Sequence, residues 1–144
     1  MSAEQGLWPC RPVNKLDKVF FTHLYADHMA DLITLSGSYS KVGRADRPVA
    51  VWGPSGSEPR LGTRHFVESI QEALAWDTAG SRGPINPDSL ELTVTEFDFR
   101  ETQVVYEANG VTVTSFPVIL MGTRFWGGLL DWVRDALLDT GKIS

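Results

Sequence analysis

Lys18-Val-Phe-Phe-Thr22 runs directly into His23-Leu-Tyr-Ala-Asp27-His28, and both the fold and the site are inferred from this stretch. The first five residues form a short, largely apolar run, which is typical of a strand buried on both faces. Two histidines and an aspartate follow at once. A loop that leaves a strand can direct alternate side chains into one cavity, so the sequence predicts a polar site at the end of this strand.

Further strands and one helix are expected downstream. Pro48-Val-Ala-Val-Trp52 indicates a second short strand, and Gly53-Pro54-Ser55-Gly56 indicates a turn into a helix. That turn lacks the lysine and the length of a phosphate-binding loop. Apolar residues at helical spacing predict a helix with Thr63 as N-cap, ending near Asp77. Alternating apolar and polar residues at 90–97 predict a half-buried strand.

A tight hairpin and a last helix complete the predicted elements. Residues 104–106 and 111–116 are two strand-like runs that flank Asn109-Gly110. This dipeptide most readily supplies the two positive φ angles of a tight turn. Residues 129–137 carry an apolar stripe at helical spacing, which includes Trp132. Such a stripe, together with Trp126, is more typical of a core or an oligomer face than of a ligand pocket.

Length and composition indicate one globular domain covering 1–144. The chain has 144 residues, of which 42% are hydrophobic, enough for one core of ordinary size. Residues 1–16 contain two prolines and show no period, so they are expected to be an irregular lead-in. The single cysteine, Cys10, excludes an intramolecular disulfide and is expected to be an inert thiol.

The charge pattern and the absence of an apolar leader restrict the expected partners and location. The net charge is −5, and the basic residues are scattered, so tight nucleic-acid binding is not expected. No stretch approaches a membrane-spanning length, and the start lacks a signal-peptide pattern. We therefore expect no membrane association and a cytoplasmic location.

The stretch Phe21-Thr-His-Leu-Tyr-Ala-Asp-His28 resembles the metal-binding loop of the metallo-β-lactamase superfamily, which reads His-x-His-x-Asp-His after an apolar strand. The resemblance continues in 51–56, 75–77 and 111–118, and it covers roughly 13–119. It is strongest to the branch that holds ribonuclease Z and arylsulfatase-like hydrolases. It implies an α/β fold, part of an αββα sandwich with a mixed sheet flanked by helices.

The resemblance also implies a metal-dependent hydrolase. Carried over position by position, His23 is a ligand of a first metal, and Asp27 and His28 are ligands of a second. Asp27 is also the expected catalytic residue. Zinc is the implied ion, one or none per chain, although another divalent metal would suit these ligands. The implied reaction is attack by a metal-bound hydroxide on a small ester, lactone, phosphodiester or sulfate.

Several positions depart from the family pattern. Tyr25 stands where the second histidine of the loop is expected, and Leu120 stands where the next histidine ligand is expected. A neutral phenol is a poor zinc ligand, and leucine cannot coordinate a metal. Residues 120–144 diverge into an expected helical tail, in which Asp139-Thr140 is at most a vestige of the bridging aspartate. The family's last ligand would lie beyond Ser144 and its first strands before Met1, so the chain is expected to be the middle of the fold.

Other interpretations remain open. The polar loop could simply cap a helix, with Asp27 accepting backbone N–H groups. The missing ligands favour a catalytically silent module that keeps the fold for binding or assembly. His65, outside the motif, is expected to be a surface histidine. An uncovered sheet and the apolar stripe at 129–137 predict a homodimer or higher homo-oligomer.

Overall fold

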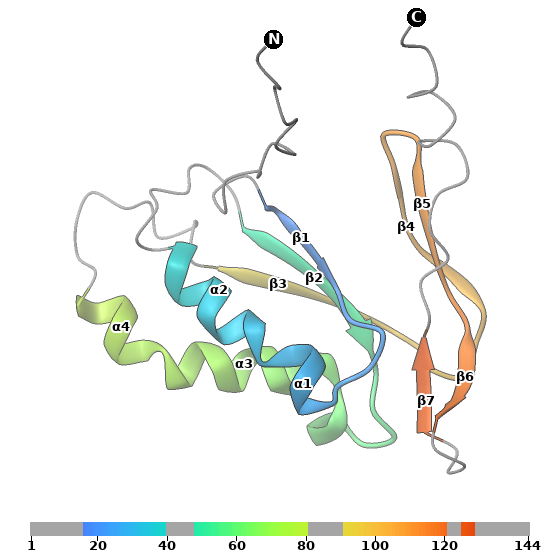
Figure 1. The fold of residues 1–144 in the computed structure, drawn as a ribbon, viewed down its shortest axis with the longest axis horizontal. Helices are drawn as coiled ribbons and strands as arrows, with labels where there is room; N and C mark the ends of the chain where they lie inside the picture. Colours follow the sequence, from blue (N-terminus) through green and yellow to red (C-terminus); the bar gives the residue numbers. More distant parts are fainter. Residues whose placement is uncertain (1–15, 40–47, 81–90, 121–124, 129–144) are drawn as a thin grey trace, which may run out of the picture.

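A computed structural model describes residues 16–39, 48–80, 91–120 and 125–128. A three-stranded sheet occupies the centre, and helices pack on one of its faces (Figure 1). Two antiparallel strand pairs lie on the other side of this sheet (Figure 1). The arrangement of helix layer, sheet and second strand layer follows the α/β layering expected from the sequence.

The central sheet is parallel. Its strands are β1 (Lys18–Phe20), β2 (Val49–Pro54) and β3 (Leu92–Phe97), in the order β1-β2-β3. Val49 and Val51 are completely buried in the middle strand. A parallel sheet covered on both faces selects such continuous apolar runs. The three strands were all predicted, with boundaries shifted by one or two residues.

The described helices are α1 (Ala26–Met29), α2 (Asp31–Tyr39), the 3-10 helix η2 (Pro59–Leu61), α3 (Thr63–Ala73) and α4 (Ala75–Gly80). The longer helices, α2 and α3, contribute buried side chains to the core on one face of this sheet. Leu32 of α2 and Val67 and Ile70 of α3 pack against the buried valines of β2. Burying each such side chain stabilises the fold by about 1.5–3 kcal/mol.

The predicted hairpin is confirmed. β4 (Gln103–Ala108) pairs antiparallel with β5 (Val111–Ser115), and Asn109 and Gly110 form the turn between them. Asn109 has φ 53° and Gly110 has φ 75°. Both positive angles are those that a two-residue hairpin turn requires, and asparagine and glycine adopt them at low cost.

An aromatic cluster connects the hairpin to the central sheet. The rings of Phe20 and Trp52 stack with centroids 4.8 Å apart on the face that points away from the helices. Tyr106 of β4 meets both rings edge-on, at 5.7 Å and 5.2 Å. Edge-to-face and offset-stacked rings are favourable aromatic geometries. The two strand layers are therefore held together beside the ends of β1 and β2.

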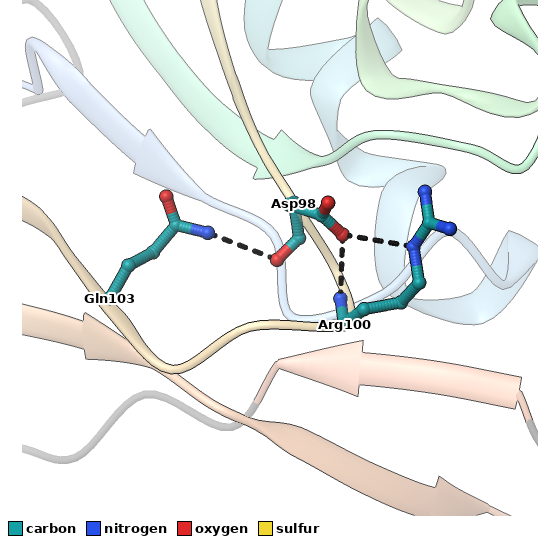
Figure 2. A network of polar contacts seen from close by, with 3 residues as sticks. All are labelled: Asp98, Arg100 and Gln103. Carbon is teal, nitrogen blue, oxygen red and sulfur yellow. Dashed lines mark hydrogen bonds and ion pairs between the residues drawn. The ribbon is translucent and has the colours of Figure 1, made fainter.

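The turn from β3 to β4 is fixed by polar contacts (Figure 2). The Asp98 carboxylate accepts hydrogen bonds from the backbone N–H of Arg100 at 2.8 Å and from its Nε at 3.2 Å. Gln103 Nε2 donates to the Asp98 carbonyl oxygen at 3.1 Å. The backbone bond from Arg100, which is the main cause, lowers the pKa of Asp98. This turn directs the chain from the parallel sheet into the second strand layer.

The expected helical tail is wrong for the part of it that the structure describes. Residues Phe125–Gly128 form a strand, β7, which pairs antiparallel with β6 (Pro117–Leu120). Leu120 pairs with Phe125, so the chain returns along β6 after a short connection. The predicted helix at 129–137, the lead-in through residue 15 and Cys10 lie outside the described residues.

The predicted N-cap role of Thr63 is also wrong. Gly62 is the N-cap of α3, and Thr63 is the first helical residue. The Thr63 hydroxyl is fully buried and donates to the Pro54 carbonyl oxygen at 2.9 Å, so it joins the helix start to the end of β2. The carboxylate of Glu96 accepts instead from the Arg64 N–H at 2.9 Å. A residue of β3 thus satisfies one of the free donors of the first helical turn.

We predict that Gly53→Ala destabilises the protein. A Cβ at Gly53 would press against the Thr63 hydroxyl and lie 2.8 Å from Thr63 Cγ2, so α3 would have to move. Overpacking of this kind lowers the free energy of unfolding by about 1–3 kcal/mol, measurable by urea denaturation. Gly80→Ala is the matched control, because no atom lies within 4 Å of its added Cβ. Equal unfolding free energies for the two variants would contradict the close packing of α3 on β2.

Candidate metal centre

The candidate site begins where β1 ends. The Phe21 side chain is buried, and its N–H donates to the Trp52 carbonyl oxygen at 2.8 Å, one residue beyond the strand. The chain then leaves the sheet at its carboxyl edge, and α1 begins at Ala26. Ligand sites of open α/β sheets commonly lie outside the carboxyl ends of the strands. The predicted polar site is therefore located in such a position.

His23 lies in the loop between β1 and α1 and contacts three side chains. Its Nδ1 lies 2.9 Å from the Thr22 hydroxyl. Its ring lies 4.1 Å from the ring of His28 and 4.8 Å from the ring of Tyr25, between centroids. The two histidines of the motif are thus brought into contact, although four residues separate them in the chain.

Asp27 and His28 both come from α1, and both are exposed. The Oδ2 of Asp27 lies 3.5 Å from the Nε2 of His28, with side-chain exposures of 79% and 50%. Two ligands of a tetrahedral zinc ion, each bonded at about 2.0–2.1 Å, lie about 3.3–3.4 Å apart. The separation of these two atoms therefore fits two ligands of one zinc ion.

A purely structural role for Asp27 as a helix cap finds no support in the hydrogen bonds of α1. Tyr25 is the N-cap, and its side chain makes no cap hydrogen bond. The Tyr25 carbonyl oxygen accepts from the N–H groups of His28 and Met29, at 2.9 Å and 3.2 Å. The carboxylate of Asp27, in the first turn, lies where the partial positive charge of the helix start favours it.

The two departures from the family pattern occupy different places in the fold. Tyr25 is 38% exposed, and its ring meets the ring of His23 edge-on at an interplanar angle of 83°. Leu120 is the last residue of β6, which pairs with β7 and is not a strand of the parallel sheet. Asp139 and Thr140 lie outside the described residues.

The donors present fit part of a metal centre. Imidazole and carboxylate are the groups that zinc binds in proteins. Within 16–39, 48–80, 91–120 and 125–128, no group of three or more His, Cys, Asp or Glu side chains could hold a metal ion. The donor atoms of Asp27 and His28 are close enough to serve one ion, and the ring of His23 lies beside them. These side chains alone do not make up a complete metal site among the described residues.

A groove opens beside His28. It has a volume of about 410 Å³ and runs between β1 and α2. Val19, Phe21, Leu32 and Leu35 give it apolar walls, and Asp31 contributes a carboxylate. His65 lies apart from this region, exposed on α3, as predicted for a surface histidine. The sequence did not predict the groove, because its walls come from two elements whose packing depends on the whole sheet.

Thr22 is the contact residue that sequence reasoning missed. Its position, directly between the buried Phe21 and His23, was the available signal.

Among the described segments, no helix is long and apolar enough to cross a membrane.

The chain is similar in sequence to ribonuclease Z enzymes of two bacteria. No family model matches the chain. A ribonuclease Z of Lacticaseibacillus casei is 30% identical over 130 residues, which are 90% of this chain and 38% of that protein. A ribonuclease Z of Bacteroides fragilis is 28% identical over 105 residues, which are 73% of this chain and 29% of that protein. The chain thus spans about a third of the length of these curated relatives.

A solved structure supports the same fold. The crystal structure of human tRNase Z, short form, matches with a TM-score of 0.57 and 17% identity, over 81% of this chain and 44% of that chain. This match confirms the mixed α/β fold, and together with the ribonuclease Z relatives it confirms the resemblance to the metallo-β-lactamase superfamily.

The expected partners are contradicted by these relatives. A small-molecule substrate and the absence of tight nucleic-acid binding were predicted, whereas the relatives are named as enzymes of RNA, and of tRNA in the human case. The expectation of no tight nucleic-acid binding rested on the net charge of −5 and on the scattered basic residues. A whole-chain sum does not report the local field at a site, and this chain is only part of the length of those enzymes.

We predict that the neighbours of His23 set its protonation. Partial burial, and then the charge of His28, lower the pKa of His23 below its ordinary value of 6.5, while Asp27 raises it. His28→Gln should therefore raise this pKa, and Asp27→Asn should lower it further. NMR titration of the imidazole resonances in metal-free protein measures both shifts, with His65→Gln as the control that leaves His23 unchanged.

The lowered pKa of His23 also makes the stability of the fold depend on pH. The unfolded chain binds a proton at His23 more readily than the folded chain does. The contribution of this group to stability is therefore present above pH 6.5 and is lost as the pH falls through the folded-state pKa. Shifts of the His23 pKa in the reverse directions in the two variants would contradict the contacts described for this loop.

Proposed function

We propose that this chain, which has the fold of the metallo-β-lactamase superfamily, supplies the metal-facing loop of a hydrolase that cleaves phosphodiesters of RNA. The observation that carries the proposal is the convergence of His23, Asp27 and His28 at the carboxyl end of β1. The ribonuclease Z relatives support the substrate class. The small ester-like substrate expected from the sequence is replaced by RNA.

The roles of the three residues follow from their contacts. Asp27 and His28 would hold one zinc ion, since their donor atoms are 3.5 Å apart. His23 would face a neighbouring ion, with its ring against the ring of His28. A bound divalent ion supplies Lewis acidity toward a phosphoryl oxygen and makes water more acidic. The catalytic role assigned to Asp27 is limited to holding the ion in this proposal.

The surroundings of His28 suit a substrate larger than a phosphate. The groove between β1 and α2 is lined in part by this imidazole and has room for a group of ligand size. Its apolar walls would accept the flat face of a base, while the sugar–phosphate chain stays near the exposed loop. The Asp31 carboxylate would accept hydrogen bonds from sugar hydroxyls or amino groups.

A second candidate function is a catalytically silent module of the same fold, which binds or assembles without hydrolysis. Tyr25 and Leu120 favour it, because each replaces a nitrogen ligand with a side chain that binds zinc poorly or not at all. The lack of a three-ligand group among the described residues also favours it. The organisation of 1–144 as one domain, a cytoplasmic location and a homo-oligomer stay predictions for either function.

We predict that the purified protein binds zinc weakly, at less than two ions per chain. One position keeps two adjacent ligands and the other keeps only His23. Tyr25→His should raise the zinc affinity modestly, because it restores a second imidazole beside His23. Elemental analysis and calorimetric titration measure both quantities, with Tyr106→His, in the aromatic cluster, as a control that should not raise the affinity. Two tightly held zinc ions in the unmodified protein would contradict this expectation.

We predict metal-dependent cleavage of a transfer RNA transcript. Cleavage should appear when zinc or manganese is added, disappear with a chelator, and fall to the metal-free level in His23→Ala and His28→Ala. His65→Ala is the matched control, since it removes an exposed histidine from α3 and should cleave like the unmodified protein. Gel analysis of the end-labelled transcript gives the rates.

The outcomes separate the two candidates. Cleavage that survives in His23→Ala and His28→Ala would exclude this loop as the site. RNA that binds without being cleaved, at any metal concentration, would support the silent module. Cleavage of a small phosphodiester but not of the transcript would contradict RNA as the substrate class.

A further inference from the structure

The hydroxyl of Thr22 contacts the ring of His23, and the sequence had predicted no role for this hydroxyl. Phe21 is buried, and its N–H bond to Trp52 closes the pairing of β1 with β2. Thr22 follows at once, so its backbone is held by a rigid sheet on one side. Threonine is β-branched, which restricts its χ1 angle. The position of its hydroxyl is therefore well defined relative to His23.

The contact engages one specific nitrogen of the imidazole. Thr22 Oγ1 lies 2.9 Å from His23 Nδ1. A neutral imidazole carries one N–H donor and one lone-pair acceptor, while a hydroxyl can take either role. Because Nδ1 is occupied by this contact, Nε2 is the nitrogen left to meet a ligand. It can do so only if the proton is on Nδ1.

We propose that Thr22 is a positioning residue for His23. Its hydroxyl oxygen accepts a hydrogen bond from Nδ1–H, which keeps the lone pair on Nε2 and fixes the direction of the ring. Metal-binding histidines generally donate their second ring N–H to a carboxylate, a backbone carbonyl or a water, and the Thr22 hydroxyl would take that place here. The inference rests on the proposed function, since a ring that meets a metal ion needs an unprotonated Nε2.

The ring contacts of His23 complete the orientation. Tyr25 meets the ring edge-on at 4.8 Å, and His28 lies against it at 4.1 Å. These contacts restrict rotation of the ring, but neither selects which nitrogen carries the proton. In the proposal this choice falls to the Thr22 hydroxyl, which contacts Nδ1 and would favour the Nδ1–H form by accepting its hydrogen bond.

The test is the tautomer of His23 in the metal-free protein, read from imidazole 15N chemical shifts at about pH 8, where histidine is neutral. The unmodified protein should show His23 protonated at Nδ1. Thr22→Val, which keeps the shape and removes the hydroxyl, should shift His23 toward the Nε2–H form. Thr22→Ser should restore the Nδ1–H form. His65 in the same spectra and Thr93→Val, at an exposed position of β3, are the controls.

The affinity for zinc is a second measurement that tests the same inference. Loss of an outer-shell partner typically lowers metal affinity about 10–100-fold, so Thr22→Val should bind zinc that much more weakly, and Thr22→Ser should bind close to the unmodified protein. A His23 ring protonated at Nε2 in the unmodified protein, or one unchanged in Thr22→Val, would overturn the inference. The tautomer is measured without metal or RNA, so a lack of RNA cleavage would sink the proposed function and leave this result standing.

Discussion

The parallel pairing of β1 with β2 is the interaction on which the rest of the structure depends. It buries Val51 and Phe21 against α2 and α3, and it fixes the point at which the chain leaves the sheet. The Phe21 N–H bond to Trp52 is the last link of this pairing. Thr22, His23 and α1 follow from that fixed point. The relative positions of the candidate ligands are thus set by a buried backbone contact rather than by the exposed loop itself.

The same pairing explains why the two faces of the sheet pack against different elements. On one face the side chains of β1 and β2 enter the helical core, and on the other Phe20 and Trp52 receive Tyr106 from the hairpin. Strand side chains alternate between the faces, so consecutive residues of β1 serve both layers. A substitution at Phe20 therefore acts on the strand layers, whereas one at Phe21 acts on the helix packing.

Local patterns predicted the parallel strands, the hairpin and α3, but they did not predict α2 or any contact between segments distant in the chain. The Asn109-Gly110 turn and the three parallel strands follow from features within a few residues of sequence. Thr63 looks like an N-cap in sequence, but its hydroxyl donates to Pro54, whose position depends on how β2 and α3 pack. β7 was missed because Gly127 and Gly128 disfavour a strand and its apolar run is very short. Of the site, the spacing of the motif predicted the clustering of His23, Asp27 and His28, but not the contact of Thr22 with His23 or the groove.

The register of the central sheet also has a consequence for the order of folding. Lys18 pairs with Ala50, and Ala50 pairs with Thr93, so the parallel sheet joins segments that are distant in the chain, whereas β4 and β5 are joined by a two-residue turn. Pairing strands that lie far apart in the chain is slow relative to forming a hairpin. The hairpin is therefore able to form while the parallel strands are still apart. Because the loop that carries His23 and His28 leaves the end of β1, we expect its arrangement to form only once the parallel sheet has paired.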